Sequence, residues 1–193
     1  MKIYFFPFAE QPVNNWTGGI TRQLAIFPFN ADLAERNFIF RISTATVETE
    51  RSAFSKFAGF QRILMILEGE LKIDHKEHHI KELSPFETDI FDGSWETTAE
   101  GKVVDFNVIY SDKVKSAEVK KFELSNGQRQ TIESVDFIGI YVLSGSMKMN
   151  GRELKEKDFV LVEQEITKGK LELLATSGCK YILVSIYTKK NHN

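Results

Sequence analysis

Hydrogen-bonding and charged side chains lie on one face of two otherwise apolar segments. In FIFRISTAT, Arg41 and Ser43 alternate with apolar residues, and in VVDFNVIY, Asp105 and Asn107 do the same. Because side chains alternate across a β-strand, each pair shares one face of its strand. A guanidinium, a hydroxyl, a carboxyl and an amide can together bind a small polar molecule. Such faces also occur where a strand meets water, so both interpretations stay open.

A third charged residue, Arg62, directly precedes the apolar run ILMIL. The lack of alternation in that run indicates a strand buried on both faces. A charge beside a buried strand needs a partner or a ligand. Arg62 therefore favours a pocket over a solvated face. Asp105 fits better as an ion-pair partner that orients Arg41 or Arg62 than as half of an acid–base dyad.

The segment NNWTGGITRQL brings Trp16, Gly18, Gly19 and Thr21 close together in the sequence. Glycines allow close approach to the backbone, and Trp16 offers a flat wall with one N–H donor. The spacing matches neither phosphate-binding fingerprint. A glycine pair before a strand is also typical of a turn or bulge, so the segment by itself is weak evidence for a binding loop.

Motifs of common catalytic sites are absent from the sequence. There is no Gly-x-Ser-x-Gly elbow, no His-Glu-x-x-His and no phosphate loop. No histidine lies in a predicted strand where it could act as a base for Ser43 beside Asp105. We expect the cluster in DHKEHH to be an exposed, solvated hairpin tip and not a metal site. The four histidines are His75, His78, His79 and His192.

Composition excludes several classes of protein. The chain has 193 residues, of which 42% are hydrophobic and 27% charged, as in folded globular proteins. The net charge is −2 and no segment concentrates Lys and Arg, which argues against nucleic acid as a partner. No apolar run approaches the ~20 residues of a membrane span. The one cysteine, Cys179, lies in an apolar run, which predicts a buried thiol and a cytoplasmic location.

The periodicity predicts a mainly β fold. Apolar, β-branched and aromatic segments at strand length are bounded by Gly, Ser, Asn or Asp. The best helix candidates are short, at residues 30–36 and 111–120. The predicted strands cover residues 38–47, 62–73, 103–110, 137–149, 158–163 and 181–187.

An internal repeat organises these strands. ILEGELKI, residues 66–73, matches VLSGSMKM, residues 142–149, at an offset of 76, and the endings of VDFNVIY and YILVSIY match at an offset of 77. Turn-rich segments, including the hairpin signal Asn150-Gly151, separate paired strands. Two matches in the same order predict two similar β units, with a seam near residues 121–130. We therefore expect an N-terminal unit over 1–120 and a degenerate C-terminal one over 121–193.

Six short segments, in order and at compatible spacing, resemble the HutD/Ves family of cupin-like proteins. They are WTGGIT, FRISTA, FSKFAGFQR, LEGEL, FDG and DFN, and the likeness covers residues 10–187. The resemblance implies a double-stranded β-helix (cupin, jelly-roll) bicupin with two similar β-barrel halves. It also implies a bacterial small-ligand-binding regulator associated with histidine utilisation. The loop at Trp16 is shorter than the family's Trp-basic-Asn-Gly-Gly-Gly, which weakens the case for backbone contacts from it.

Counting the cupin motifs onto this chain argues against a metal. The usual His pair would fall within Ser55-Lys56-Phe57, the usual Glu at Arg62, and the second-motif His near Glu96. An arginine in place of a carboxylate ligand favours an anion over a divalent cation. We therefore expect no metal and no cofactor.

The preferred interpretation is a non-enzymatic binding protein with a pocket in its N-terminal barrel. The Arg41 and Arg62 guanidiniums suit a small carboxylate, such as the formylglutamate that the family's association suggests. Ser43, Thr21 and Asn107 would bond an amide or formyl group, Asp105 would orient an arginine, and Trp16 would cover the ligand. Several of the sixteen Phe residues flank these positions, which predicts an aromatic wall for this pocket.

Two alternatives remain. Metal-independent cupin enzymes perform isomerase or epimerase chemistry, although the expected lumen here has no histidine. The C-terminal half, with few polar residues in its strands, fits a packing surface or a homodimer interface, and its apolar segment YILVSIY does not distinguish these.

Overall fold

The computed structural model describes residues 1–133, 135–164 and 169–189, and within these ranges it is built almost entirely of antiparallel β-strands. Helical structure among them is limited to one 3-10 turn, η1 (Phe8–Glu10). No helix in this part of the chain has the length and apolar character needed to cross a bilayer. The predicted all-β class is confirmed. The chain forms two compact units, Pro12–Val114 and Met1–Gln11 with Lys115–Asn193, called here the N-terminal and C-terminal units.

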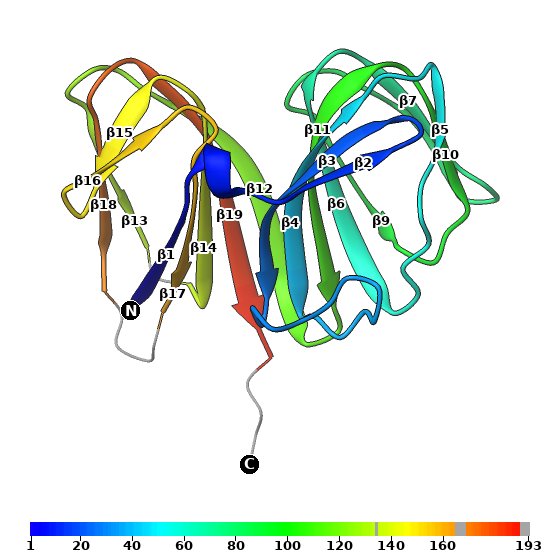
Figure 1. Ribbon diagram of the computed structural model, residues 1–193, viewed down its shortest axis with the longest axis horizontal. Helices are drawn as coiled ribbons and strands as arrows, with labels where there is room; N and C mark the ends of the chain where they lie inside the picture. The colour runs from blue at the N-terminus through cyan, green and yellow to red at the C-terminus, as the bar shows by residue number, and fades with distance from the viewer. Residues whose placement is uncertain (134, 165–168, 190–193) are drawn as a thin grey trace. The chain divides into compact units, whose positions relative to one another are not determined.

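The N-terminal unit consists of two sheets (Figure 1). The six-stranded sheet has the order β2 (Val13–Trp16), β3 (Gly19–Phe27), β4 (Phe40–Val47), β11 (Val103–Ser111), β6 (Phe60–Glu68) and β9 (Thr88–Asp92). The four-stranded sheet has the order β5 (Arg51–Ala53), β10 (Thr97–Glu100), β7 (Leu71–His75) and β8 (His79–Leu83). Alternate side chains of β6 and β7, such as Leu64, Ile66 and Ile73, form a buried core cluster with residues of neighbouring strands.

The C-terminal unit repeats this arrangement with fewer strands. Its five-stranded sheet has the order β1 (Lys2–Phe6), β17 (Phe159–Glu163), β14 (Phe137–Ser144), β19 (Cys179–Thr188) and β12 (Val114–Leu124). Its four-stranded sheet has the order β13 (Arg129–Ile132), β18 (Leu171–Ala175), β15 (Ser146–Met149) and β16 (Arg152–Lys155). Cys179 belongs to its buried core, as predicted, and burial raises the pKa of this thiol to about 11.

The sequence repeat coincides with equivalent strands. The first match spans the break between β6 and β7, and the second spans the break between β14 and β15. Gly69 and Gly145 stand at these breaks with φ of 83° and 77°. A Cβ at Gly69 would lie 2.4 Å from the carbonyl oxygen of Lys102, and one at Gly145 would lie 2.0 Å from that of Gly178. Both positions therefore need glycine, for its backbone conformation and for the close approach of the backbone that directly precedes β11 or β19.

Two helix candidates are wrong. Residues 30–36 form turns, in which the Asp32 carboxylate accepts hydrogen bonds from the backbone N–H groups of Ala34 and Glu35. Most of residues 111–120 belongs to β12, whose partly buried and exposed side chains largely alternate. A half-exposed strand rich in Lys and Glu has a polar composition similar to that of a surface helix, so composition does not distinguish the two.

The first strand of the chain belongs to the C-terminal unit. Strand β1 pairs antiparallel with β17, from Lys2 opposite Glu163 to Phe6 opposite Phe159. The N-terminal unit accordingly runs from Pro12 to Val114, whereas the sequence predicts 1–120. A short strand at one end of a sequence carries no local signal for which sheet it joins, since this depends on pairing with a remote strand.

Candidate functional site

One cavity of about 290 Å³ in the N-terminal unit brings the predicted site residues together. Trp16, Thr21, Arg41, Ser43, Arg62, Asp105 and Asn107 all line it. Its other lining residues come mainly from β4, from the chain around β5 and from the 54–57 segment, and they include Asn14, Ser52, Phe54, Ser55 and Phe57. The volume is near the lower end of the ~300–1,000 Å³ typical of ligand pockets, so it suits a small molecule.

The pairing of β4 with β11 explains why four of these residues converge. Ser43 lies opposite Asn107, and Arg41 lies opposite Ile109, in the antiparallel register. Residues that face each other across neighbouring strands point to the same side of the sheet. The polar faces of the two strands are therefore one surface, and it lines the cavity.

Arg41 is held by two side chains at the cavity. Its Nε donates to Gln23 Oε1 at 2.9 Å, and its Nη1 donates to Ser43 Oγ at 3.1 Å. The side chain is buried, and this burial lowers the pKa of Arg41 to about 10. Arg41 is still cationic at neutral pH. Gln23 therefore positions Arg41, a role that the sequence pattern does not reveal because a β-bulge between Gln23 and Ala25 interrupts the alternation of β3.

Arg62 is surrounded by aromatic rings. Its guanidinium carbon lies 4.8 Å from the ring centroid of Phe54, 5.1 Å from that of Phe91 and 5.9 Å from that of Phe57. Its Nη1 makes a long hydrogen bond of 3.4 Å to the carbonyl oxygen of Ser55. Burial lowers the pKa of Arg62 to about 10, a shift that the charge of Asp105 opposes and that of Arg41 adds to. The predicted aromatic wall is present around this residue.

Three buried polar atoms on the cavity-lining residues have no hydrogen-bond partner in the described part of the chain. They are Arg62 Nε, Asp105 Oδ1 and Asn107 Oδ1. One is a cationic donor and two are acceptors. Leaving such groups unpaired costs about 1–3 kcal/mol each, so a ligand that pairs them would gain that free energy. The set fits a ligand that carries both a carboxylate and an N–H group.

The expected ion pair between Asp105 and an arginine is absent from the described structure, where no N–O distance of 4.0 Å or less joins them. Asp105 is buried, and this raises the pKa of its carboxyl to about 7 against the opposing charge of Arg62 and a backbone hydrogen bond from Ala45. The carboxyl can therefore change its protonation state near neutral pH.

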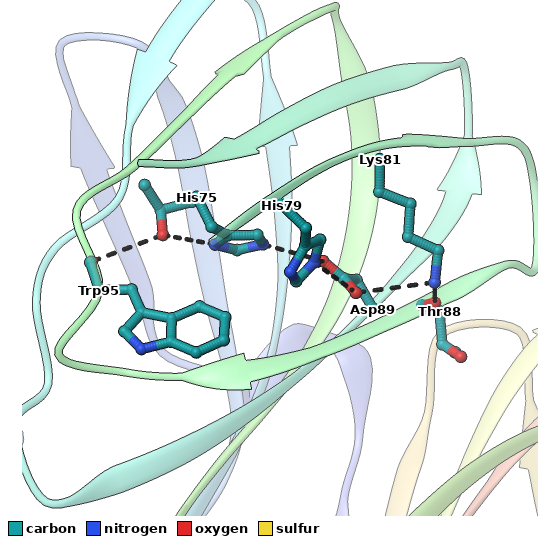
Figure 2. A network of polar contacts seen from close by, with 7 residues as sticks. His75, His79, Lys81, Thr88, Asp89 and Trp95 are labelled. Carbon is teal, nitrogen blue, oxygen red and sulfur yellow. Dashed lines mark hydrogen bonds and ion pairs between the residues drawn. The ribbon is translucent and has the colours of Figure 1, made fainter. Parts of the chain in front are cut away.

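The histidine cluster differs from the predicted solvated tip. His75 is 1% exposed at the end of β7, and it pairs across the β7–β8 hairpin with His79. His75 Nε2 lies 2.9 Å from Asp89 Oδ2, and His79 Nε2 lies 3.2 Å from the same atom (Figure 2). Burial lowers the pKa of His75, although its hydrogen bond to Asp89 has the opposite effect. The prediction is wrong for His75 because the strand continues to residue 75 and its alternation turns that side chain inward. His192 lies outside the described residues.

Comparison with known proteins identifies relatives of this chain. The model of the HutD family matches residues 8–181. A Pseudomonas putida protein described as an uncharacterized 21.2 kDa protein in the hutC 3' region is 30% identical over 126 residues, which are 61% of this chain and 63% of that protein. The alignment thus spans less than two thirds of the relative.

Solved structures share the fold. HutD from Pseudomonas fluorescens SBW25, determined in a formate condition, matches 98% of this chain and 100% of its own with a TM-score of 0.76 at 20% identity. The bacterial pirin YhhW from Escherichia coli, in complex with nickel(II), matches 97% of this chain and 100% of its own with a TM-score of 0.75 at 12% identity. The cupin-like fold expected from the resemblance is confirmed.

Proposed function

This chain belongs to the HutD family, and on that premise we propose that its N-terminal unit binds a small carboxylate that also carries an amide or formyl group. The observation that carries the proposal is the convergence of two buried arginines and three unpartnered polar atoms on one cavity. Guanidinium groups bind carboxylates through paired N–H donors. The cavity is small and cationic, which favours a small anion over a polymer.

The polar groups other than Asp105 have complementary roles in this proposal. Arg62 Nε donates to a ligand carboxylate, and Arg41 supplies a second positive charge from a position fixed by Gln23 and Ser43. Asn107 Oδ1 accepts a ligand N–H, and Thr21 and Ser43 offer hydroxyl groups to a formyl or carbonyl oxygen. Trp16 stands at the exposed rim and covers the bound molecule.

Formylglutamate is the candidate ligand, and regulation of histidine utilisation in the cytoplasm is the proposed role. Its two carboxylates suit the two arginines and its formamide N–H suits Asn107. The description of the Pseudomonas putida relative by its position at hutC supports the association with histidine breakdown. Binding without turnover is consistent with the absence of His, Cys and Lys from the residues that line the cavity.

Isothermal titration calorimetry tests this proposal. We expect N-formyl-L-glutamate to bind at least about tenfold more tightly than glutarate, which lacks the amide, since one hydrogen bond to a buried group contributes about 1–1.5 kcal/mol. Arg62→Met removes a buried charge and should abolish binding. Arg51→Ala is the control, because Arg51 is exposed and pairs with Glu100 at the surface. Equal heats for all dicarboxylates, or unchanged binding in Arg62→Met, would contradict the proposal.

One observation favours a second function, a metal-independent isomerase. Asp105 is buried in the cavity, and its pKa of about 7 suits a general acid or base at neutral pH. Proton exchange into a bound ligand provides the test. Incubation of N-formylglutamate or other histidine-pathway acids in D2O with the protein should leave their NMR spectra unchanged if the protein only binds. Deuterium incorporation that Asp105→Asn abolishes would instead establish the enzyme.

A further inference from the structure

Three metal-ligating side chains meet at one end of the N-terminal unit. His75 ends β7, His79 begins β8 and Asp89 lies in β9, which belongs to the other sheet. One ligand atom from each lies within 4.8 Å of the others. Figure 2 shows both imidazole rings directed at the Asp89 carboxylate. His75 and Asp89 are buried, and His79 is 38% exposed by its side chain, so the cluster is accessible from solvent on one side.

We propose that His75 Nε2, His79 Nε2 and a carboxylate oxygen of Asp89 bind a divalent transition-metal ion of the zinc type. Asp89 Oδ2 lies 2.9 Å from His75 Nε2 and 3.2 Å from His79 Nε2. Ligands at about 2.0–2.1 Å from a tetrahedral Zn²⁺ are about 3.3–3.4 Å apart. These two spacings are therefore within a few tenths of an ångström of those values, and all three ligand atoms lie within 4.8 Å of one another. Two imidazole nitrogens and one carboxylate oxygen suit Zn²⁺, Co²⁺ or Ni²⁺ and not Mg²⁺ or Ca²⁺.

The surroundings of His75 orient it as a metal ligand. Its Nδ1 lies 2.8 Å from Thr97 Oγ1, which in turn lies 3.5 Å from the carbonyl oxygen of Trp95. In the tautomer that donates from Nδ1 to Thr97, the Nε2 lone pair points at Asp89 and is free to bind a metal. Metal-binding histidines usually have such a partner on the second ring nitrogen. The ring of His75 is also packed against Phe91 at a centroid distance of 4.3 Å.

Lys81 limits which ions this cluster can hold. Its Nζ lies 3.6 Å from Asp89 Oδ1 and donates to the carbonyl oxygen of Thr88 at 2.7 Å. This positive charge partly neutralises the carboxylate, which weakens purely electrostatic binding of hard cations. The Lys81 ammonium group contacts Asp89 Oδ1, so Oδ2 remains available between the two imidazoles. Nitrogen ligands therefore supply most of the affinity, which again selects a transition metal.

A bound ion would connect the two sheets of the N-terminal unit. The β7–β8 hairpin contributes both imidazoles and belongs to the four-stranded sheet, whereas Asp89 belongs to the six-stranded sheet. None of the three residues is a position that the cupin motif count assigns to a metal ligand. The site is thus separate from the carboxylate pocket in its residues, although Phe91 contacts both His75 and Arg62.

Titration of the chelator-treated full-length protein with Zn²⁺ and Co²⁺ tests the proposal. We expect one Zn²⁺ per chain, a rise in the thermal unfolding temperature, and visible Co²⁺ absorption bands that report nitrogen ligation. His79→Ala should weaken binding by more than about a hundredfold, since loss of even an outer-shell partner costs about 10–100-fold. His78→Ala is the matched control, because His78 is exposed and stacks on Trp95 at 3.8 Å.

His79 is partly exposed, so its replacement leaves the buried core intact and the variant should fold. Asp89→Asn provides a second variant that keeps the shape of the side chain but removes the anionic ligand. Failure of the wild-type protein to bind one Zn²⁺ at micromolar concentration would overturn the proposal. The proposal would also be overturned if both His79→Ala and Asp89→Asn kept full affinity for Zn²⁺, or if His78→Ala lost it.

Discussion

Asp105 and Arg62 face one cavity from neighbouring strands, and the structure leaves a polar atom of each without a hydrogen bond. The carboxyl has its pKa raised by burial to about 7, and the guanidinium has its pKa lowered by burial to about 10. Around neutral pH the guanidinium is therefore charged and the carboxyl is partly protonated. The charge of the cavity depends on pH through Asp105.

Carboxylate binding should weaken as pH rises through about 7. Below this value Asp105 is neutral and both arginines attract an anion, whereas above it the Asp105 carboxylate repels one. Affinity then falls by at most about tenfold per pH unit. The ligand's own carboxylates, with ordinary pKa near 4, stay ionised over this range. Calorimetry between about pH 5.5 and 8.5 measures how ligand affinity changes with pH. This dependence should be absent from Asp105→Asn. An equal slope in that variant would show that another group titrates.

The free energy of unfolding should also depend on pH through Asp105. The folded-state pKa of Asp105 lies above its unfolded value near 4, so the folded chain binds more protons between the two values. By linkage, the contribution of this group to stability declines as pH rises from about 4 to about 7. Urea unfolding at several pH values should show a smaller decline in Asp105→Asn. Asp74→Asn, at an exposed position of β7, should unfold with the wild-type pH dependence.

Gln23→Leu should weaken ligand binding without unfolding the protein. Gln23 Oε1 accepts the hydrogen bond from Arg41 Nε at 2.9 Å, and its loss leaves Arg41 with Ser43 alone among the described side chains. A hydrogen bond to a charged group contributes about 1.5–3 kcal/mol, so we expect a loss of about tenfold or more in affinity. Gln61→Leu removes an exposed hydrogen bond to Asp92 and should have no such effect. Unaltered affinity in Gln23→Leu would exclude the positioning role.

Trp16 should report ligand binding by its fluorescence. The chain has two tryptophans, and Trp16 lines the cavity whereas Trp95 packs against His78. We expect ligand to change the emission of the wild type and of Trp95→Phe, but not that of Trp16→Phe. Trp16→Ala should also lower affinity by a few-fold through loss of the rim cover. A ligand-induced change of emission that persists in Trp16→Phe would show that the ligand binds away from Trp16.

Gly145→Ala should destabilise the protein more than Gly151→Ala. Both glycines have a positive φ, 77° and 79°, so the conformational cost of alanine, about 1–2 kcal/mol, is shared. At Gly145 the new Cβ also meets the carbonyl oxygen of Gly178 at 2.0 Å, whereas nothing lies within 4 Å of the one at Gly151. The difference between the two variants in their loss of unfolding free energy, measured by urea denaturation, reports the effect of the close contact alone. Equal losses of stability in the two variants would mean that the Gly178 backbone moves away from residue 145 at no cost in free energy.

The sequence is informative wherever a strand alternates regularly. Alternation identified the shared faces of Arg41 with Ser43 and of Asp105 with Asn107, and the register of β4 and β11 places those faces together. The repeat also predicts two β units from its two matches in the same order, and the structure shows that Gly69 and Gly145, which the first match aligns, each occupy a position that tolerates no side chain. Local patterns of this kind carry over directly into structure because they reflect the geometry of a single strand.

Contacts between remote strands could not be predicted in the same way. Asp89 approaches His75 only because β9 and the β7–β8 hairpin belong to different sheets that meet at that end. The role of Gln23 could not be predicted because the bulge in β3 changes which face of the sheet its neighbours point to. The missing ion pair of Asp105 has a similar origin, since an N–O distance depends on side-chain packing that alternation does not describe.

The pairing of β1 with β17 sets an order of events during synthesis. Residues Pro12–Val114 form one continuous stretch, so every strand that lines the cavity is available as soon as that stretch has left the ribosome. Strand β1, by contrast, is made before that stretch and finds its partner only after Phe159–Glu163 has been translated. Until then β1 is a nascent segment without its sheet. The N-terminal unit can therefore fold before the C-terminal unit, which needs strands from both sides of it in the sequence.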